Sequence, residues 1–463
     1  MSEKPKPNII LINCDDLGYG DLTCYGSERN DTPTLDRLAQ EGMRFTDFYM
    51  ASPVCSASRA AMLTGCYSQR IGFGDYQVLF PGQAQGLNPR EKTMAAQLKA
   101  AGYATKMVGK WHCGDQPDFL PTNHGFDEYF GLPYSNDMGR QRNFLNRPPL
   151  PLLRNDRVVQ QQPDQTGLTE RYVDEALEFI RREREHPFFL YFAHMYVHVP
   201  LFVPKPFLEN SRNGAYGGAV ACIDWAMKAI DAELERLGLK EDTLLIFTSD
   251  NGSRAMDEGG SNAPLRGTKA QTWEGGLRVP CIIRWPGKVE AGSTCGGIAS
   301  SIDLLATIAE LTGAPLPEGT ALDSISLADT LREGRPSKRR VFAYYKDANL
   351  EAVRMDDWKL HFCKTGWNPD GSEGQVATEL YHLREDVGET TNVAAEHPAV
   401  VAQIEEVAEE FRRKFGDARL GRAGSEIRPI GHCEQPEPLT AYDENHPYVV
   451  ACYDLEDGST MFG

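Results

Sequence analysis

Residues Asn8-Ile9-Ile10-Leu11-Ile12-Asn13 form a short apolar run that stops at Asp15 and Asp16. Three further runs end in the same way: residues 104–108 before Lys110 and His112, residues 188–192 before His194 and His198, and residues 243–248 before Asp250 and Asn251. Short apolar runs bounded by turn residues are typical of buried parallel strands. In open α/β sheets, ligands bind outside the carboxyl ends of such strands. The four runs therefore predict one sheet edge that carries carboxylates, lysine and histidines.

The composition is that of a globular protein that can bury a large core. The chain has 463 residues, of which 41% are hydrophobic and 25% charged, and its length favours two or three domains. The formal net charge of −18 argues against nucleic acid or an anionic membrane surface as a partner. An anionic substrate would therefore need a locally basic pocket. No apolar stretch approaches the roughly 20 residues of a membrane-spanning helix.

The N-terminus and the cysteines bear on the compartment. The first residues, Met1-Ser-Glu-Lys-Pro-Lys-Pro, contain no apolar signal segment, so the chain as printed is expected in the cytoplasm. A longer precursor would instead place it in the periplasm or outside the cell. The eleven cysteines are odd in number and irregularly spaced, which is not the pattern of a disulfide framework. There is also no Cys-x-x-Cys pair for zinc.

Strand-like and helix-like segments alternate over the first two-thirds of the chain. Helices are expected at residues 33–41, 93–101, 169–185 and 220–237, with Pro33 at the first position of the first helix and Gly42 after its end. Residues 143–165 are proline-rich and polar, and we expect an irregular loop there. Each helix precedes a strand, which implies right-handed crossovers. The predicted fold is α/β, with a large mixed, mainly parallel sheet sandwiched by helices.

The pattern changes after about residue 335. Residues 341–345, 351–354 and 358–362 resemble short strands of a meander, and a long amphipathic helix follows at residues 398–415. We therefore expect three parts. Residues 1–335 form the main α/β domain, residues 336–421 form a smaller C-terminal α+β subdomain with an antiparallel sheet and a helix, and residues 422–463 form a tail packed on the core.

Asp15, Asp16, Asp250 and Asn251 offer three carboxylates and an amide carbonyl from two strand ends. These hard oxygen donors suit Ca²⁺, or alternatively Mg²⁺, and argue against zinc. One pair of adjacent aspartates is often only a turn or a helix cap. Two such groups on separate strands are stronger evidence, because three converging carboxylates would repel one another without a cation. The sequence therefore predicts a metal site.

A second candidate element lies in residues 52–65, where Ala57 to Leu63 is good helix material and Cys55 falls at the helix N-terminus. There the helix dipole favours an anion and is expected to lower the pKa of the thiol. Arg59 lies one turn further on. A lone cysteine in such a place is more often structural than catalytic. Single lysines such as Lys110 and Lys269 are equally ordinary on a protein surface.

The surrounding pattern resembles the formylglycine-dependent sulfatases of the alkaline phosphatase superfamily. Cys55-Ser-Ala-Ser-Arg59 is similar to their signature, although Ala57 stands where most members have proline; an alanine variant occurs among bacterial members. Further similar segments follow in family order: Asp15-Asp16-Leu-Gly-Tyr-Gly-Asp21, Val108-Gly-Lys110-Trp-His112, His198-Val-Pro200, Thr248-Ser-Asp250-Asn251, and Leu265-Arg-Gly-Thr-Lys269 with Glu274-Gly-Gly-Leu-Arg-Val-Pro280. The resemblance covers about residues 7–415.

The resemblance implies an alkaline phosphatase-like fold and a sulfuric ester hydrolase. It also implies Ca²⁺ held by Asp15, Asp16, Asp250, Asn251 and the modified Cys55. A partner enzyme, either a formylglycine-generating enzyme or a radical maturase, would oxidise Cys55 to formylglycine. The residues that the resemblance places around the nucleophile and the sulfate are Arg59, Lys110, His112, His198 and Lys269.

These roles suit the chemistry of a sulfate monoester, whose oxygens repel a nucleophile until cations gather them. In the implied mechanism a hydroxyl of the hydrated aldehyde attacks sulfur, and the alcohol leaves with a proton from His198, assisted by Lys269. His112 then draws a proton from the second hydroxyl, which expels sulfate and restores the aldehyde. A serine or an unmodified cysteine has no second hydroxyl and would stop at a stable ester.

The substrate class rests on two segments, residues 91–130 and 198–207, which are similar to sulfatases that act on galactose or galactosamine sulfates. They favour a sulfated glycan or a small carbohydrate sulfate. One alternative is a phosphomonoester, phosphodiester or phosphonate hydrolase on the same fold. Another is an inactive member that binds sulfated glycans. A homo-oligomer is compatible with the sequence, which does not determine the oligomeric state.

Overall fold

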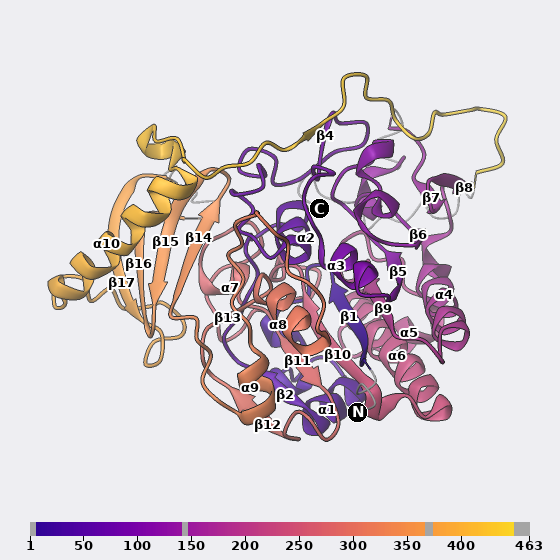
Figure 1. The fold of residues 1–463 in the computed structure, drawn as a ribbon, viewed down its shortest axis with the longest axis horizontal. Coiled ribbons are helices and arrows are strands. Elements are labelled where there is room, and N and C mark those ends of the chain that lie inside the picture. Colours follow the sequence, from indigo (N-terminus) through magenta and orange to yellow (C-terminus); the bar gives the residue numbers. More distant parts are fainter. Residues whose placement is uncertain (1–5, 141–146, 366–373, 449–463) are drawn as a thin grey trace.

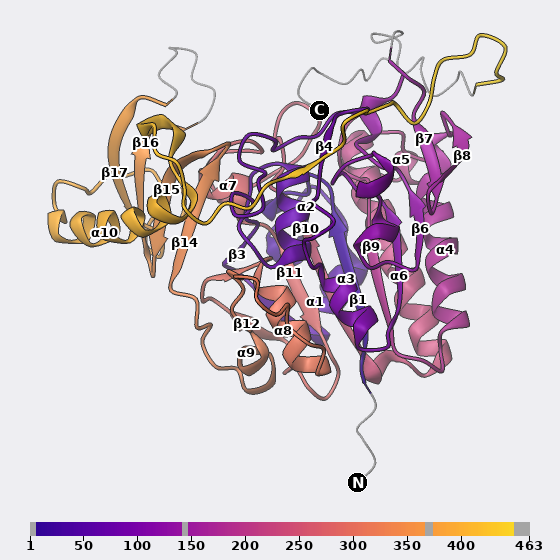
Figure 2. The same cartoon turned by 45° about the horizontal axis from the view of Figure 1, so that its top comes forward.

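The structure, a computed structural model, describes residues 6–140, 147–365 and 374–448. Its centre is a ten-stranded sheet in the order β12-β2-β11-β10-β1-β9-β5-β6-β7-β8 (Figures 1 and 2). The strands are β1 (Asn8–Cys14), β2 (Met43–Phe45), β5 (Ala104–Gly109), β6 (Glu128–Gly131), β7 (Pro151–Arg154), β8 (Arg157–Gln161), β9 (Phe188–Ala193), β10 (Thr243–Ser249), β11 (Cys281–Arg284) and β12 (Ser293–Cys295). The four predicted strands are neighbours, in the order β10-β1-β9-β5, and all pair in parallel.

Antiparallel strands lie on both sides of this parallel centre, because β11 pairs antiparallel with β10, and β7 with β6 and β8. The helices of the main domain are α1 (Pro33–Glu41), α2 (Cys55–Thr64), α3 (Met94–Ala100), α4 (Leu168–Arg182), α5 (Lys205–Glu209), α6 (Gly214–Leu237), α7 (Glu274–Leu277), α8 (Asp303–Thr312) and α9 (Ala328–Glu333). Two short strands, β3 (Phe48–Tyr49) and β13 (Ala299–Ser300), pair outside the large sheet. This arrangement confirms the predicted fold class.

Both faces of the central sheet are buried, which explains why its strands read as continuous apolar runs. Along β1, Ile9 and Leu11 pack into a core that includes side chains of α2, α3, α8 and α9. Ile10 and Ile12 point to the opposite face and pack with side chains of α1, α4 and α6. Because successive side chains of a strand point to opposite faces, one apolar run serves two cores.

The helix boundaries differ from the predicted ones most clearly at α6, which begins six residues before the predicted start at Val220. Its first turns contain Gly217 and Gly218, which lower helix propensity and hid this part of the helix in the sequence. The structure explains both glycines by close packing. An added Cβ would lie 2.4 Å from Ser211 Oγ at Gly217, and 2.8 Å from Val203 Cγ1 at Gly218.

The loop predicted for residues 143–165 is wrong over its described part, which contains the hairpin β7–β8. Asn155 makes the tight turn with a left-handed φ of 57°, a conformation that asparagine tolerates. The hairpin lies at the edge of the sheet, where β8 is partly exposed and needs few apolar residues. Polar composition was therefore a poor guide here. Residues 143–146 lie outside the described residues.

The C-terminal part contains a four-stranded antiparallel sheet, β14 (Val341–Lys346), β15 (Asn349–Met355), β16 (Trp358–Cys363) and β17 (Val376–His382), in that order. Helix α10 (Pro398–Phe415) packs on this sheet through Ile404, Ala408 and Phe415. The first three strands and the helix coincide closely with the predicted segments, whereas β17 was not predicted. Its first residue, Val376, is 81% exposed, so β17 lacks the signal of a buried strand.

The described part of the tail runs from α10 across the main domain towards β7 and β8 (Figure 2). Strand β18 (Gly431–His432) pairs with β4 (Gln85–Gly86), and Arg428 Nε lies 2.7 Å from Glu91 Oε1. Residues 449–463 lie outside the described residues. The ten cysteines in the described part of the chain are all free. Among the described residues there is no helix with the length and apolar character needed to span a membrane.

Candidate active site

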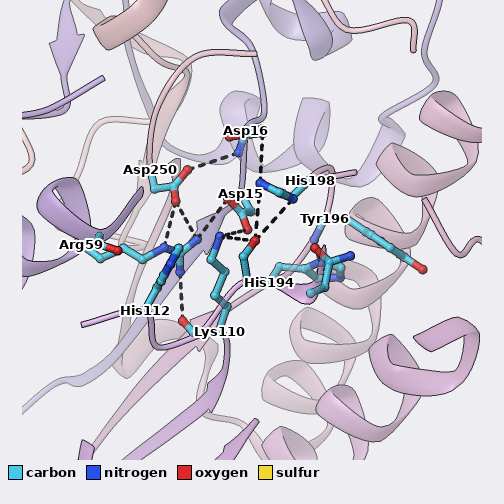
Figure 3. Close-up of polar contacts among 12 residues, drawn as sticks. Asp15, Asp16, Arg59, Lys110, His112, His194, Tyr196, His198 and Asp250 are labelled. Atoms are coloured by element: carbon cyan, nitrogen blue, oxygen red, sulfur yellow. Dashed lines mark hydrogen bonds and ion pairs between the residues drawn. The ribbon is translucent and has the colours of Figure 1, made fainter. Parts of the chain in front are cut away.

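The ends of the four central strands bring the predicted side chains together (Figure 3). In the parallel pairing of β1 with β10, Cys14 lies opposite Ser249, so that the next residues, Asp15 and Asp250, emerge side by side. The Asp250 amide donates to the Cys14 carbonyl at 3.0 Å, and the Asp16 amide donates to Asp250 Oδ1 at 3.2 Å. The two acidic pairs, 234 residues apart in the chain, therefore form one cluster.

Three buried cations neutralise the three carboxylates of this cluster. Arg59 directs both Nε and Nη2 to Asp250 Oδ2, each at 2.8 Å. Lys110 Nζ lies 2.5 Å from Asp15 Oδ2, and Lys269 Nζ lies 2.9 Å from Asp16 Oδ2. A charge can be buried this deeply only when it is paired and hydrogen-bonded. Pairing with carboxylates explains why these cations are buried rather than on the surface.

Helix α2 brings the nucleophile candidate to the same place. It begins at Cys55, as predicted, and Ser58 Oγ donates to the Asp250 carbonyl at 2.5 Å, which fixes the helix start against the end of β10. Cys55 Sγ and one carboxylate oxygen each of Asp15 and Asp250 all lie within 4.8 Å of one another.

The expected lowering of the thiol pKa is wrong for the unmodified chain. Burial raises the pKa of Cys55, and Lys110 and Lys269 only partly offset this. The thiol at the helix N-terminus is buried, and desolvation disfavours its thiolate.

The oxygen donors of the cluster fit a hard divalent cation. Among the described residues, Asp15 Oδ1 and Asn251 Oδ1 are buried without a hydrogen-bond partner. These two acceptors follow the paired strands β1 and β10. Asn251 Nδ2 meanwhile donates to Asp16 Oδ1 at 2.7 Å. Burial raises the pKa of Asp250 to about 7 in spite of Arg59. A cation at these oxygens would satisfy the acceptors and favour the ionised carboxylates.

Two site residues have left-handed backbone conformations that are unusual outside glycine: Asp16 with φ of 61° and His112 with φ of 59°. Such strain costs about 1–3 kcal/mol per residue and collects at functional sites. At both positions the chain leaves a strand and turns sharply. The turn aims each side chain back at the cluster.

The two predicted catalytic histidines are both neutral in this setting, with defined hydrogens. Burial lowers the pKa of His112 well below its usual value, with a further contribution from Lys110. Burial and Lys269 likewise lower the pKa of His198. His112 Nε2 lies 3.0 Å from the Leu79 carbonyl, which assigns the hydrogen to Nε2 and leaves a lone pair on Nδ1. His198 Nδ1 lies 2.6 Å from the Val199 carbonyl, which leaves Nε2 facing Asp16 Oδ2 at 3.9 Å.

His194 and His124 have packing roles in the structure. The Tyr196 amide donates to His194 Nδ1 at 3.0 Å, and burial lowers the pKa of His194 to about 3. His124 is buried against Trp111, with ring centroids 5.5 Å apart, and burial lowers its pKa to about 4. Both rings therefore stay neutral and support the strand ends.

Ser135 belongs to the site although the sequence analysis did not single it out. Its hydroxyl lies 3.2 Å from Lys110 Nζ and 3.4 Å from the His198 ring, and the residue is almost completely buried. It follows β6, the strand beside β5, by four residues. The available signal was this position just beyond a strand end. A serine in a loop with prolines is too common for the signal to stand out.

Comparison with known proteins identifies the family. The sulfatase family profile matches residues 7–314, and a profile described as the C-terminal region of aryl-sulfatase matches residues 337–431. The chain belongs to the sulfatase family. It is a sulfuric ester hydrolase, and the four strand ends and α2 lie within the matched residues 7–314.

Two curated relatives show how far this sulfatase follows known members. Human N-acetylgalactosamine-6-sulfatase is 37% identical over 446 residues, which cover 92% of this chain and 84% of the relative. Human arylsulfatase A is 39% identical over 442 residues, which cover 87% of each chain. The crystal structure of Ps i-CgsB in complex with k-i-k-neocarrahexaose superposes with a TM-score of 0.77 at 30% identity, covering 88% of this chain and 92% of that one.

The buried His124 predicts an acid-sensitive stability. Its folded-state pKa of about 4 lies below the usual value of 6.5, so the proton prefers the unfolded chain and stability falls as pH drops below about 6.5. At pH 5 this amounts to about 2 kcal/mol. The variant His124→Phe keeps a ring against Trp111 and cannot titrate. Its Tm relative to that of the unmutated sulfatase should therefore be a few degrees higher at pH 5 than at pH 8, as measured by scanning calorimetry. Equal differences at the two pH values would contradict the assignment.

Proposed function

We propose that this sulfatase hydrolyses sulfate monoesters of galactose- or N-acetylgalactosamine-type carbohydrates, using a formylglycine made from Cys55 and a bound Ca²⁺. The observation that carries the proposal is the meeting of Cys55 with the oxygen donors of Asp15 and Asp250 inside a ring of buried cations. The residues that would hold the ion are Asp15, Asp16, Asp250, Asn251 and residue 55.

The charge balance of the site favours an anionic substrate. The carboxylates of Asp15, Asp16 and Asp250 are matched by the cations of three other residues, and both histidines are neutral. A divalent ion would therefore leave a net positive charge in a site closed to water. Coulomb attraction is strong in such a medium, so a sulfate ester is drawn in despite the overall charge of −18.

Each side chain has a task that follows from its position. Hydrated formylglycine would supply the attacking hydroxyl, and Ca²⁺ would favour its ionised form. Lys110 and Lys269, at the ends of the cluster, bind the sulfate oxygens and stabilise the charge that develops on them. Ser135 holds Lys110 in place through its hydroxyl. Arg59 pairs with Asp250, which orients the carboxylate and opposes the effect of burial on its pKa.

His198 is the proposed proton donor and His112 the proposed proton acceptor. His198 presents Nε2 to the site, so a proton on Nε2 is in place to pass to the leaving alcohol. His198 Nε2 and the ammonium of Lys269 both face Asp16 Oδ2. His112 is neutral with a lone pair on Nδ1, the form that a general base requires. A bound sulfate ester opposes the effect of Lys269 and raises the pKa of His198.

The carbohydrate class rests on the relatives. The curated relative with 37% identity is named for N-acetylgalactosamine 6-sulfate, and the solved structure with 30% identity holds neocarrahexaose. Phosphate and sulfate esters are nearly isosteric, so a phosphate or phosphonate ester is the chemical competitor against which the sulfatase activity is measured. The relatives named above favour the sulfatase, and matched nitrophenyl sulfate and phosphate esters distinguish the two.

Peptide mass spectrometry across residue 55 tests the proposal directly. We expect the protein co-produced with a maturase to carry an aldehyde at residue 55 and to hydrolyse 4-nitrophenyl sulfate faster than 4-nitrophenyl phosphate. Cys55→Ala should lose this turnover. A quantitatively free thiol in active protein would refute the formylglycine, and faster phosphate hydrolysis would refute the substrate class. Sulfated glycan binding by a protein with a free thiol and no turnover would favour the inactive alternative.

Calcium should stabilise the folded protein, because an ion that binds only the folded state raises Tm with its concentration. We expect Ca²⁺ to raise the Tm of the chelator-treated sulfatase, and Asp250→Ala to lose both this shift and turnover. Asp303→Asn is the control, because Asp303 is a buried carboxylate paired with Arg339 outside the site. The control should keep the calcium shift. Undiminished activity of Asp250→Ala would remove the metal assignment.

His198→Ala tests the proton donor through the leaving group. A nitrophenolate needs little protonation, whereas a sugar alkoxide cannot leave without a proton. The variant should therefore lose about 10²–10⁴-fold in kcat on a galactose sulfate and much less on 4-nitrophenyl sulfate. Measured kcat values for both substrates decide the question. Equal losses on the two substrates would show that His198 does not act as the acid.

A further inference from the structure

A second buried charged cluster lies between the main domain and the C-terminal sheet. Lys359 of β16 contacts Glu274 Oε1 at 3.0 Å and Glu389 Oε1 at 2.8 Å, and all three side chains are fully buried. Replacing buried ion pairs by apolar groups often costs nothing, so such a cluster is weak evidence for stability. Its position points to another role, because Glu274 follows Lys269 by five residues.

The segment that carries Lys269 is tied to the active site at its middle. The Lys269 amide donates to the Ser253 carbonyl at 3.0 Å, and the Ala270 amide donates to the Pro53 carbonyl at 3.0 Å. Pro53 lies two residues before Cys55, and Ser253 lies two residues after Asn251. The backbone of this segment therefore sets the distance from the Lys269 ammonium to residue 55 and to Asp16.

Directly after Ala270, the C-terminal domain forms hydrogen bonds with the segment through Thr272. The Thr272 amide donates to Thr365 Oγ1 at 3.1 Å, and its hydroxyl donates to Glu351 Oε2 at 2.6 Å. The Thr272 carbonyl accepts from Lys359 Nζ at 2.8 Å. Each of the three hydrogen-bonding groups of Thr272 therefore has a partner from the C-terminal domain.

Glu389, in the loop after β17, holds both ends of the same segment. Its Oε2 accepts from the Glu274 amide at 2.8 Å, and its backbone carbonyl accepts from Arg266 Nη1 at 2.7 Å. Glu389 has a left-handed φ of 50°, a strained conformation for a residue with a side chain. Strain of this kind persists only where the surroundings fix it, and it collects at functional sites.

We propose that the C-terminal sheet positions Lys269 for catalysis, with Lys359, Glu389 and Thr272 as the positioning residues. Fixed hydrogen bonds on both sides of a short segment hold the ammonium where the sulfate oxygens arrive. Apolar packing would permit sliding, whereas a fully satisfied polar network specifies one arrangement. The inference rests on the proposed function, in which Lys269 binds sulfate.

A double-mutant cycle tests this coupling with the calcium-loaded, formylglycine-bearing protein. Lys359→Met keeps the stem and removes the charge, and we expect it to lower kcat on 4-nitrophenyl sulfate by about 10- to 100-fold, the effect of a small displacement of a catalytic group. In a Lys269→Ala background the same change should cost less than about twofold, since interacting sites are not additive. An equal loss in both backgrounds would overturn the proposal. Arg340→Met, which breaks an exposed ion pair to Asp356 beside the same sheet, is the control and should leave kcat unchanged.

A second pair of variants keeps the test valid if Lys359→Met does not fold. Thr272→Val preserves shape and loses the hydrogen bond to Glu351, whereas Thr272→Ser preserves the hydroxyl. Thr272→Val should weaken the binding of inorganic sulfate, measured by calorimetry, and Thr272→Ser should restore it. The weakening should disappear in the Lys269→Ala background. Persistence there would contradict positioning through Lys269. A protein that binds sulfate in this way without hydrolysing esters would refute the proposed function and leave the positioning role intact.

Discussion

The active site depends on the buried pairing of Arg59 with Asp250. The guanidinium comes from α2, one turn after Cys55, and the carboxylate follows the last residue of β10, so this contact joins α2 to the sheet. Both side chains are completely buried, and neither charge could be sealed from water without the other. Once this pair is in place, Cys55 has a fixed position next to Asp15. The other buried cations then follow the carboxylates that each strand end supplies.

A balance of opposite charges also explains how an acidic protein handles an anionic substrate. The chain as a whole has a net charge of −18, while within the site three cations pair with the three carboxylates. Burial strengthens local charges and weakens the influence of distant ones, which solvent screens. The proposed Ca²⁺ adds the positive charge that attracts sulfate. The same burial keeps His112 neutral, which is the form that a general base requires.

In the proposed positioning role, the second sheet acts on Lys269, the lysine that we propose to bind sulfate. The loop at residues 272–274 meets the C-terminal sheet through buried polar contacts, beside the apolar packing of Trp273 against Tyr381 and Leu383. A domain that served only to cover apolar surface would not need Lys359 at this place. Positioning through a rigid neighbour suits a lysine, because its long, flexible side chain gives little orientation of its own.

The sequence alone determined the parallel centre of the sheet, the start of α2, and the set of side chains at the strand ends. These follow from local patterns: apolar runs of strand length, the helix preference of residues 57–63, and oxygen donors placed directly after the runs. Only the tertiary structure decided the sign of the Cys55 pKa shift, the membership of Ser135 and the hydrogen bonds from the C-terminal domain to Thr272. Each of these depends on burial or on partners far away in the chain. Desolvation and long-range pairing are properties of the folded molecule, and no local sequence pattern encodes them.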